Sequence, residues 1–307
     1  MAATSAEVQL VCLSTTLVIS KLLFYTPSSN AGNNLRFLSY VETQHEVSIV
    51  FEERLLDKFA NGVLEFEPLR WKALQVASAG PGAFLSQLAV LTQLTTELAK
   101  HGVSVFQIST YQSDYVLVKV EDLETAIACL QSFCCIEMED GQELTLPTMH
   151  QHPLSVPDVK LHLVQLNKTF VRRHMYSLVK LLFKSQEDEE TRFLSYSETG
   201  DDISVVTSDE CFLEKARSLM KQGDQGVLVS PDFWRPVQIG NSKLGFAETG
   251  IVAGQTRVLV NAGTTVFYLS TYATDFMLIK EDEWEDALPI LRDHFSLTEG
   301  VFAPLTA

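Results

Sequence analysis

The feature that most constrains the fold is an internal duplication. Four short blocks of the first half of the chain recur in the second half, in the same order and about 160 residues later. Residues 36–40 (Arg-Phe-Leu-Ser-Tyr) return unchanged as residues 192–196. The other pairs are residues 18–24 with 177–183, 71–76 with 234–239, and 109–115 with 270–276. Colinear recurrence indicates a tandem duplication, so we expect both halves to adopt one fold.

A segment without apolar periodicity separates the two copies. Residues 140–157 contain Gly141, Pro147, Pro153 and Pro157. Gly and Pro interrupt helices and strands, so this composition predicts a linker.

Helix and strand patterns alternate within each copy. In the first copy we expect strands at 10–13, 36–40, 47–51, 74–77, 103–110 and 115–120, and helices at 18–24, 84–100 and from about 123. Gly102 marks the end of the second helix. The last helix has apolar residues at i, i+3, i+4, i+7 and i+11 from Leu123, and the same spacing recurs from Trp284. We expect Trp71 and Trp234 in the core.

This order of elements predicts an α+β fold with two small units in each half. A βαββαβ unit of about 70 residues is a ferredoxin-like sandwich, one sheet with two helices on one face. The predicted units are residues 1–69, 70–139, 158–232 and 233–307, with the linker at 140–157. The strand that completes the first unit of each half is not evident from the sequence.

Charge and motifs exclude several functions. The chain of 307 residues has 23 basic and 39 acidic side chains, a net charge of −16, which disfavours nucleic acid and anionic membranes as partners. Phosphate-binding loops, a GxSxG nucleophile motif and the HExxH zinc motif do not occur, and the histidines lack metal-ligand spacing. We therefore predict no catalytic residue, no metal site and no cofactor.

The cysteines and the start of the chain indicate a cytosolic protein. Five cysteines form no CxxC pair, which favours buried free thiols in a reducing compartment. Residues 8–24 are mostly apolar, but no basic residue precedes them, Lys21 interrupts them, and part of the segment recurs inside the chain. A folded element is a better interpretation than a targeting signal.

Three blocks carry a resemblance to a known family. Residues 103–105 with 109–114, residues 244–253 (Leu-Gly-Phe-Ala-Glu-Thr-Gly-Ile-Val-Ala) and residues 270–275 resemble the CASTOR family. This family consists of cytosolic arginine sensors built from four ACT domains. The resemblance is strongest in the second and fourth units and spans nearly the whole chain. It implies four ferredoxin-like ACT domains in two tandem pairs, and a non-catalytic sensor.

The resemblance also implies a ligand and partners. One arginine would lie between the second and fourth units. Its contacts would be Ser104, Val105, Gly245, Glu248, Ile251, Val252, Thr271, Tyr272, Ala273, Thr274 and Asp275. A GATOR-type complex, which regulates TOR-pathway signalling, would dock on Tyr111, Gln112 and Asp114 until arginine releases it. A homodimer would form through sheet faces of the first and third units, weakened by repulsion at Asp201 and Asp202 beside the strand 203–206.

The chemistry of a free amino acid supports such a site independently. Its carboxylate suits the unpaired N–H groups of a helix N-terminus, which Gly240, Gly245 and Gly250 would let it approach. Its ammonium suits carbonyl oxygens and a hydroxyl such as that of Ser104. A guanidinium needs a carboxylate that accepts two parallel N–H bonds, and Asp275 and Glu248 are candidates.

Several alternatives remain open at this point. Asp114 and Asp275 occupy equivalent positions and could both be structural turn residues. The glycines could form only a flexible turn, and Tyr111 could pack against the other half. The alternative function is an ACT-domain regulator that binds another amino acid, such as lysine, and controls a biosynthetic enzyme. A scaffold whose pocket has lost its ligand is a further alternative.

Overall fold

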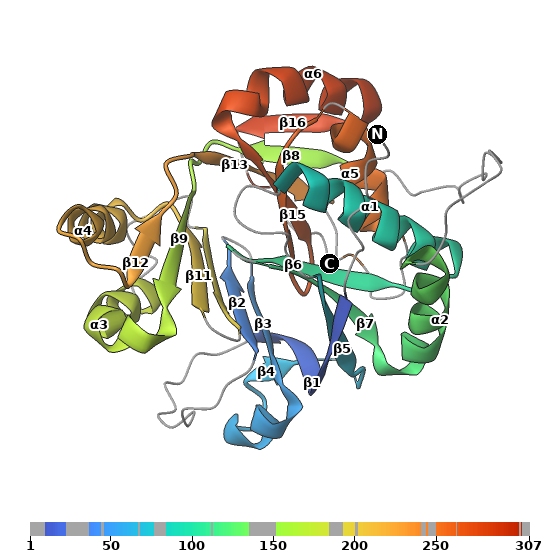
Figure 1. Cartoon of the computed structure of the whole chain (residues 1–307), viewed down its shortest axis with the longest axis horizontal. Coiled ribbons are helices and arrows are strands. Elements are labelled where there is room, and N and C mark those ends of the chain that lie inside the picture. Colours follow the sequence, from blue (N-terminus) through green and yellow to red (C-terminus); the bar gives the residue numbers. More distant parts are fainter. Residues whose placement is uncertain are drawn as a thin grey trace, which may run out of the picture.

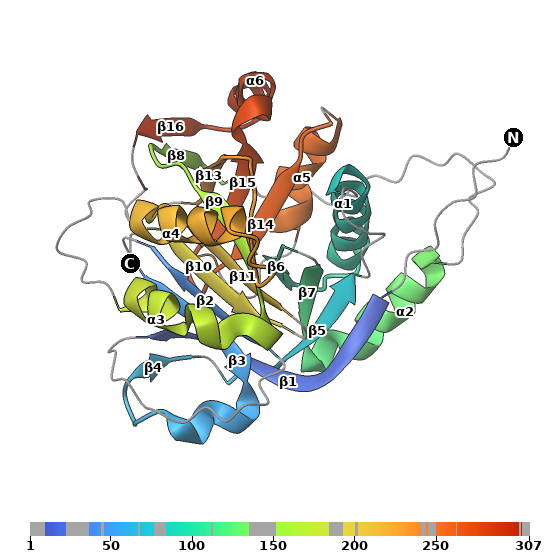
Figure 2. The same ribbon diagram turned by 60° about the vertical axis from the view of Figure 1, so that its left-hand side comes forward.

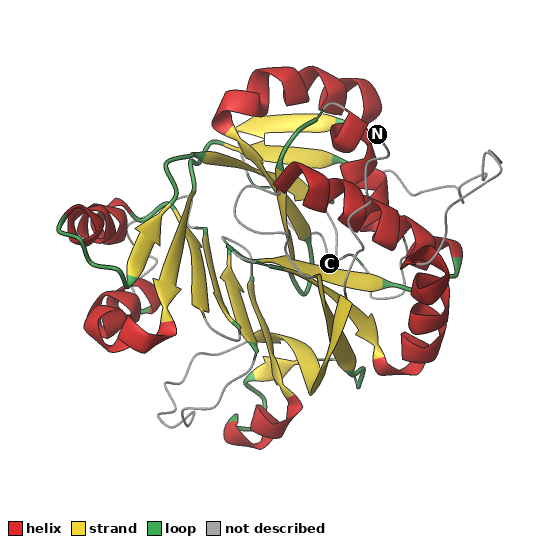
Figure 3. Cartoon of the chain, in the orientation of Figure 1, coloured by secondary structure: helices red, strands yellow, loops and turns green. Residues whose placement is uncertain are grey.

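The described strands form one large sheet that surrounds a central core, with the helices outside it (Figures 1 and 3). The computed structural model describes residues 10–22, 37–43, 46–66, 68–76, 84–111, 113–134, 152–183, 193–199, 202–240, 244, 250–261, 263–300 and 302. Gly245, Glu248 and Gln112 of the predicted sites lie outside the described residues. No helix of the described part is long and apolar enough to cross a membrane.

The third predicted unit has the complete βαββαβ order. Its elements are β9 (His162–Asn167), η3 (Lys168–Phe170), α3 (Val171–Leu182), β10 (Leu194–Glu198), β11 (Asp202–Thr207), α4 (Glu210–Lys221) and β12 (Val227–Val229). The strands pair antiparallel in the order β12-β9-β11-β10. Apolar residues of α3 and α4, including Leu178 and Leu213, pack on this sheet. The predicted α+β fold is confirmed here, and β12 is the completing strand that the sequence left unassigned.

The fourth unit repeats this order and gains one strand. Its elements are β13 (Trp234–Ile239), α5 (Ile251–Asn261), β14 (Val266–Ser270), β15 (Asp275–Lys280), η5 (Glu281–Glu283), α6 (Trp284–His294) and β16 (Leu297–Gly300). β8 (Leu154–Pro157) lies between β13 and β16 and runs parallel to β16. The last four residues of the predicted linker are therefore a strand, because Leu154 and Val156 are buried in the core of the fourth unit.

The first two units share one long strand. The elements of the first half are β1 (Leu10–Leu22), β2 (Leu38–Glu42), β3 (Val47–Glu52), η1 (Glu53–Lys58), β4 (Leu64–Glu65), β5 (Trp71–Val76), α1 (Phe84–Lys100), β6 (Val105–Ser109), β7 (Asp114–Lys119), η2 (Val120–Asp122) and α2 (Leu123–Cys134). β1 pairs with β5 along its N-terminal part and with β3 and β4 along its C-terminal part. In the second half this path is divided into β8 and β9, with a bridge between Leu161 and Trp234. The predicted helix at 84–100 is confirmed, and Gly102 follows it with a φ of 72°.

The predicted helix at 18–24 is wrong, because residues 18–22 belong to β1. Val18 and Ile19 are buried in two different apolar clusters, on opposite faces of the strand, as a two-residue period requires. The similar residues 177–182 do form a helix, α3. Ile19 lies opposite Val50, and Leu163 lies opposite Val206, so Ile19 corresponds to β9 and not to α3.

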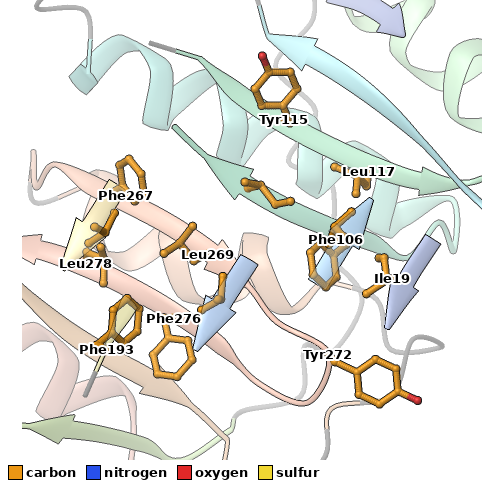
Figure 4. Close-up of a cluster of buried hydrophobic side chains, with 14 of the residues drawn as sticks. Ile19, Phe106, Tyr115, Leu117, Phe193, Phe267, Leu269, Tyr272, Phe276 and Leu278 are labelled. Atoms are coloured by element: carbon orange, nitrogen blue, oxygen red, sulfur yellow. The ribbon is translucent and has the colours of Figure 1, made fainter. Parts of the chain in front are cut away.

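The central core repeats the duplication in its packing (Figure 4). Phe37 of the first unit meets the edge of Tyr115 of the second, with ring centroids 5.2 Å apart. Phe193 of the third unit meets the edge of Phe276 of the fourth at the same 5.2 Å. Trp71 and Trp234 are both buried in this core, as predicted.

Two strand pairs join the halves. β2 pairs with β10, with Tyr40 opposite Tyr196, and β6 pairs with β14, with Ile108 opposite Leu269. The first unit therefore meets the third, and the second meets the fourth.

Strand β11 bears on the expected homodimer. Each of its residues is buried, and Asp202 accepts hydrogen bonds from Thr199 and Gln165 of its own chain. β11 itself is therefore covered within the chain, and a homodimer through the first and third units stays a prediction.

Two cysteines have described side chains, and they differ. Cys129 is buried, as predicted, whereas Cys211 is exposed at the start of α4. Cys211 is exposed because it lies on the outer face of the amphipathic helix α4.

Candidate functional site

Two equivalent turns form the frame of the candidate site. The Thr271 hydroxyl donates to the carbonyl oxygen of Thr274 (2.6 Å) and accepts from its N–H (3.1 Å). Thr110 makes the same two bonds with Ser113, at 2.8 and 3.0 Å. A threonine hydroxyl closes a turn on itself in this way, so the repeated Ser-Thr-Tyr motif sets the local structure in both halves.

The glycine-rich block reaches one of these turns. The Leu244 N–H donates to the carbonyl of Ala273 (2.8 Å), which places residues 244 and 273 side by side. Gly250, with a φ of 80°, precedes Ile251 at the start of α5. A positive φ of this size favours glycine, so Gly250 lets the chain enter the helix at this point.

Asp275 is a buried carboxylate whose partner Tyr268 packs with residues of α5. It is the first residue of β15, lies opposite Ser270 and is 8% exposed. The Tyr268 hydroxyl donates to its Oδ2 at 2.8 Å. Burial and the Asp275 charge raise the pKa of Tyr268 well above its ordinary value, so the phenol stays protonated and keeps donating.

Asp114, the counterpart of Asp275, lies opposite Ser109 and is equally buried. Burial raises its pKa to about 6, and a hydrogen bond with Ser109 opposes part of that rise. A docking role for Asp114 stays a prediction, and the structure shows its carboxylate buried.

Tyr111 contacts the other half of the chain. Its N–H donates to the Ser204 hydroxyl at 3.1 Å, and its ring packs partly buried against the central core. The alternative that Tyr111 packs against the other half therefore describes the structure. Burial and the charge of Asp232 raise the pKa of its phenol.

The turn at 271–274 is held by the first unit through Glu46. The buried Glu46 carboxylate accepts from the Ala273 N–H at 3.1 Å, and it lies within hydrogen-bond distance of the Thr271 hydroxyl, whose single hydrogen is shared between Glu46 and the Thr274 carbonyl. Tyr272 adds a bond from its N–H to the Ser48 hydroxyl (2.8 Å). Several donors around one carboxylate offset its loss of hydration.

Asp202, the residue equivalent to Glu46, accepts hydrogen bonds from Thr199 and Gln165 of its own unit. Sequence reasoning missed Glu46, and the one signal available was that glutamate replaces aspartate at this position of the repeat.

The predicted ligand contacts divide into two groups. Val105 of β6 and Ile251 of α5 pack against the apolar cluster that contains Val252 and Tyr268. With Asp275, they lie at the junction of the second and fourth units, where α1 and α5 run side by side (Figure 2). Ser104 is also buried. The second group is the turn Thr271, Tyr272, Ala273 and Thr274, which bonds instead to Glu46 and Ser48 of the first unit.

A groove of about 180 Å³ lies elsewhere, between α3 and α4. Its lining includes Tyr176, Lys180 and Lys215, and it contains none of the predicted site residues.

Comparison with known families and proteins bears on these units. The ACT domain family matches residues 67–132 and 229–293. The cytosolic arginine sensor for mTORC1 subunit 1 of Homo sapiens is 27% identical over 304 residues, covering 89% of each chain. The Homo sapiens putative protein CASTOR3P is 33% identical over 102 residues, which are 32% of this chain and 63% of that protein. Aspartate kinase from Synechocystis aligns with 96% of this chain and 57% of its own at 13% identity, but its TM-score of 0.36 is too low to bear on fold or function.

Proposed function

Because the chain is a homologue of the CASTOR family and contains ACT domains, we propose that it is an amino-acid sensor whose ligand is arginine. Asp275 carries the proposal: it is a buried carboxylate at the junction of the second and fourth units, where a guanidinium would be its natural partner. The proposed contacts are those named from the sequence, Ser104, Val105, Gly245, Glu248, Ile251, Val252 and residues 271–275.

The groups around Asp275 suit each part of the ligand. Tyr268 donates to Asp275 Oδ2, and guanidinium N–H groups would add to that bond, since a carboxylate has about four acceptor positions. The N-terminus of α5, which follows Gly250, would receive the ligand carboxylate. Ser104 would accept from the ammonium.

The same strands connect the ligand site to the proposed partner site. The Ser270 hydroxyl accepts from the Gln107 N–H (3.0 Å), and the Ser109 hydroxyl accepts from the Tyr268 N–H (3.1 Å). Each turn is thus tied to a strand of the opposite unit. Ligand binding at Asp275 would alter the turn that carries Tyr111, and with it the docking of a GATOR-type complex that regulates TOR signalling in the cytosol.

A melting-curve screen with the twenty amino acids tests this function. At about 100 times its dissociation constant, a ligand stabilises by about 2.7 kcal/mol, which raises Tm by a few degrees for a chain of this size. We expect arginine to raise Tm. Lysine alone would favour a regulator of a biosynthetic enzyme, and no response to any amino acid would favour a scaffold.

The proposed partner needs its own measurement. Pull-down with a GATOR-type complex, without and with arginine, should show capture that arginine reduces. Capture that does not respond to arginine would contradict the proposed release mechanism while leaving ligand binding intact.

A further inference from the structure

Two buried glutamines have side-chain carbonyl oxygens that accept no hydrogen bond. They are Gln107 Oε1 on β6 and Gln255 Oε1 on α5, and each residue is 1% exposed. Buried polar atoms of folded proteins nearly always have a partner, since an unpaired acceptor is costly. Two such acceptors mark a place where N–H donors are missing.

Gln107 lies in one row with Asp275. Its N–H donates to the Ser270 hydroxyl, and Ser270 lies opposite Asp275 in the β14–β15 pair. Ile108 lies opposite Leu269, so the preceding Gln107 lies opposite Ser270. Residues directly opposite each other in antiparallel strands point to the same face. Gln107, Ser270 and Asp275 therefore share a face of the sheet across β6, β14 and β15.

Gln255 lies on the helix that covers this face. It is one turn after Ile251 and Val252, and its spacing from Val252 and Leu259 puts all three on one side of α5. Val252 and Leu259 pack in the same apolar cluster as Tyr268, whose hydroxyl bonds Asp275. Both orphan acceptors thus belong to the layer between α5 and the β6–β14–β15 sheet.

The duplicated row of residues in the other half differs from this one at a single position that matters for hydrogen bonding. The equivalent row in the other direction consists of Asp114, Ser109 and Tyr268, in which Tyr268 takes the position of Gln107. Tyr268 uses its hydroxyl within the protein, as a donor to Asp275. The side-chain carbonyl oxygen of Gln107, in contrast, accepts no hydrogen bond within the protein. Among the described residues of these two rows, the acceptor without a partner therefore lies on the Gln107 side.

We propose that Gln107 and Gln255 are specificity-determining residues of the amino-acid site, whose carbonyl oxygens accept N–H bonds from a guanidinium held by Asp275. This inference rests on the proposed function. A guanidinium has five N–H donors, and a carboxylate takes two of them in the parallel geometry, so a buried site needs further acceptors. Amide carbonyls provide these without adding a second buried negative charge.

The variants Gln107→Met and Gln255→Met test the inference, because methionine has similar length and no strong acceptor. In the absence of ligand, each should keep its Tm or gain a degree or two, since an unpaired acceptor has been removed. In calorimetric titration, each should weaken arginine binding about 10- to 100-fold, the range for a lost hydrogen bond to a charged group. A purely structural glutamine predicts the opposite pattern, a lower Tm with unchanged affinity.

Gln238 of β13 provides the matched control, because it is also a buried glutamine but has an interaction partner within the protein. Gln238→Met should lower Tm and leave the arginine affinity unchanged. Gln107→Asn is a second variant that keeps the amide but withdraws its carbonyl by one methylene, and it too should lose affinity.

The outcomes separate the inference from the proposed function. If the wild-type protein binds arginine and both Met variants bind within threefold of it, the acceptors serve water or structure and the inference is overturned, while the proposed function stands. If the wild-type protein binds no arginine, the proposed function fails and the inference fails with it.

Discussion

The burial of Asp114 predicts a specific dependence of stability on pH. Burial lifts the pKa of this carboxyl from its ordinary 3.8 to about 6 in the folded chain. A carboxyl with a raised folded pKa binds more protons when folded than when unfolded, so stability falls as pH rises from about 4 to about 6. Two pKa units correspond to about 3 kcal/mol, and the whole penalty is present above pH 6.

Replacing Asp114 by asparagine removes this penalty, because an amide is neutral at every pH and still bonds the Ser109 hydroxyl. We expect Asp114→Asn to raise the free energy of unfolding by up to about 3 kcal/mol at pH 7.5 and to change it little at pH 4. Urea unfolding of both proteins at half-unit steps from pH 4 to pH 8 measures the difference.

Glu281, whose pKa is shifted in the opposite direction, is the control. Hydrogen bonds from Arg235 hold the pKa of Glu281 down at about 2, so Glu281→Gln should lose stability at neutral pH. The reasoning on Asp114 is refuted if its asparagine variant differs from the wild type by the same amount at pH 4 and pH 7.5, or is the less stable protein at pH 7.5.

Three further predictions concern the turns and the proposed ligand. Asp275→Ala should weaken arginine binding by about two to four decades, since removing one partner of a buried ion pair costs about 3–5 kcal/mol, and Asp275→Asn should be nearly as damaging; calorimetric binding within threefold of the wild type would contradict this. Tyr111→Ala should abolish capture of the partner complex in a pull-down but leave the arginine-induced rise in Tm intact, and unchanged capture would refute that role. Glu46→Gln should accelerate hydrogen exchange at the Ala273 amide and lower the free energy of unfolding by about 2 kcal/mol, because the N–H then bonds a neutral acceptor. Asp202→Asn is the control and should leave exchange at that amide unchanged. Equal exchange rates in both variants would disprove that Glu46 holds the turn.

Structure that depends on neighbouring residues in the chain could be predicted. The helix at 84–100 and its end at Gly102 follow from periodicity and from glycine at positive φ. The turns at Thr110 and Thr271 are also local, since their hydroxyls bond backbone groups three residues away, but the sequence suggested these turns only through the equivalent aspartates Asp114 and Asp275. The duplication carried the apolar spacing of the last helix from Leu123 to its counterpart at Trp284.

Predictions failed where a segment's partners decide its structure. The segment at 18–24 and α3 share a sequence pattern, yet the first forms a strand because both of its faces meet apolar clusters. β8 looked like a linker, since its residues become a strand only beside β13 and β16. Helix propensity is a weak prior, and tertiary contacts override it.

The candidate site divides in the same way. Asp275 could be named from the sequence, because the motif that contains it is local and repeated. Glu46, Gln107 and Gln255 could not, since each matters through a residue of another unit or through the lack of any partner. Hydrogen bonds within a turn are determined by a few consecutive residues, whereas a buried acceptor becomes significant only when packing removes water and leaves it with the neighbours that the fold provides.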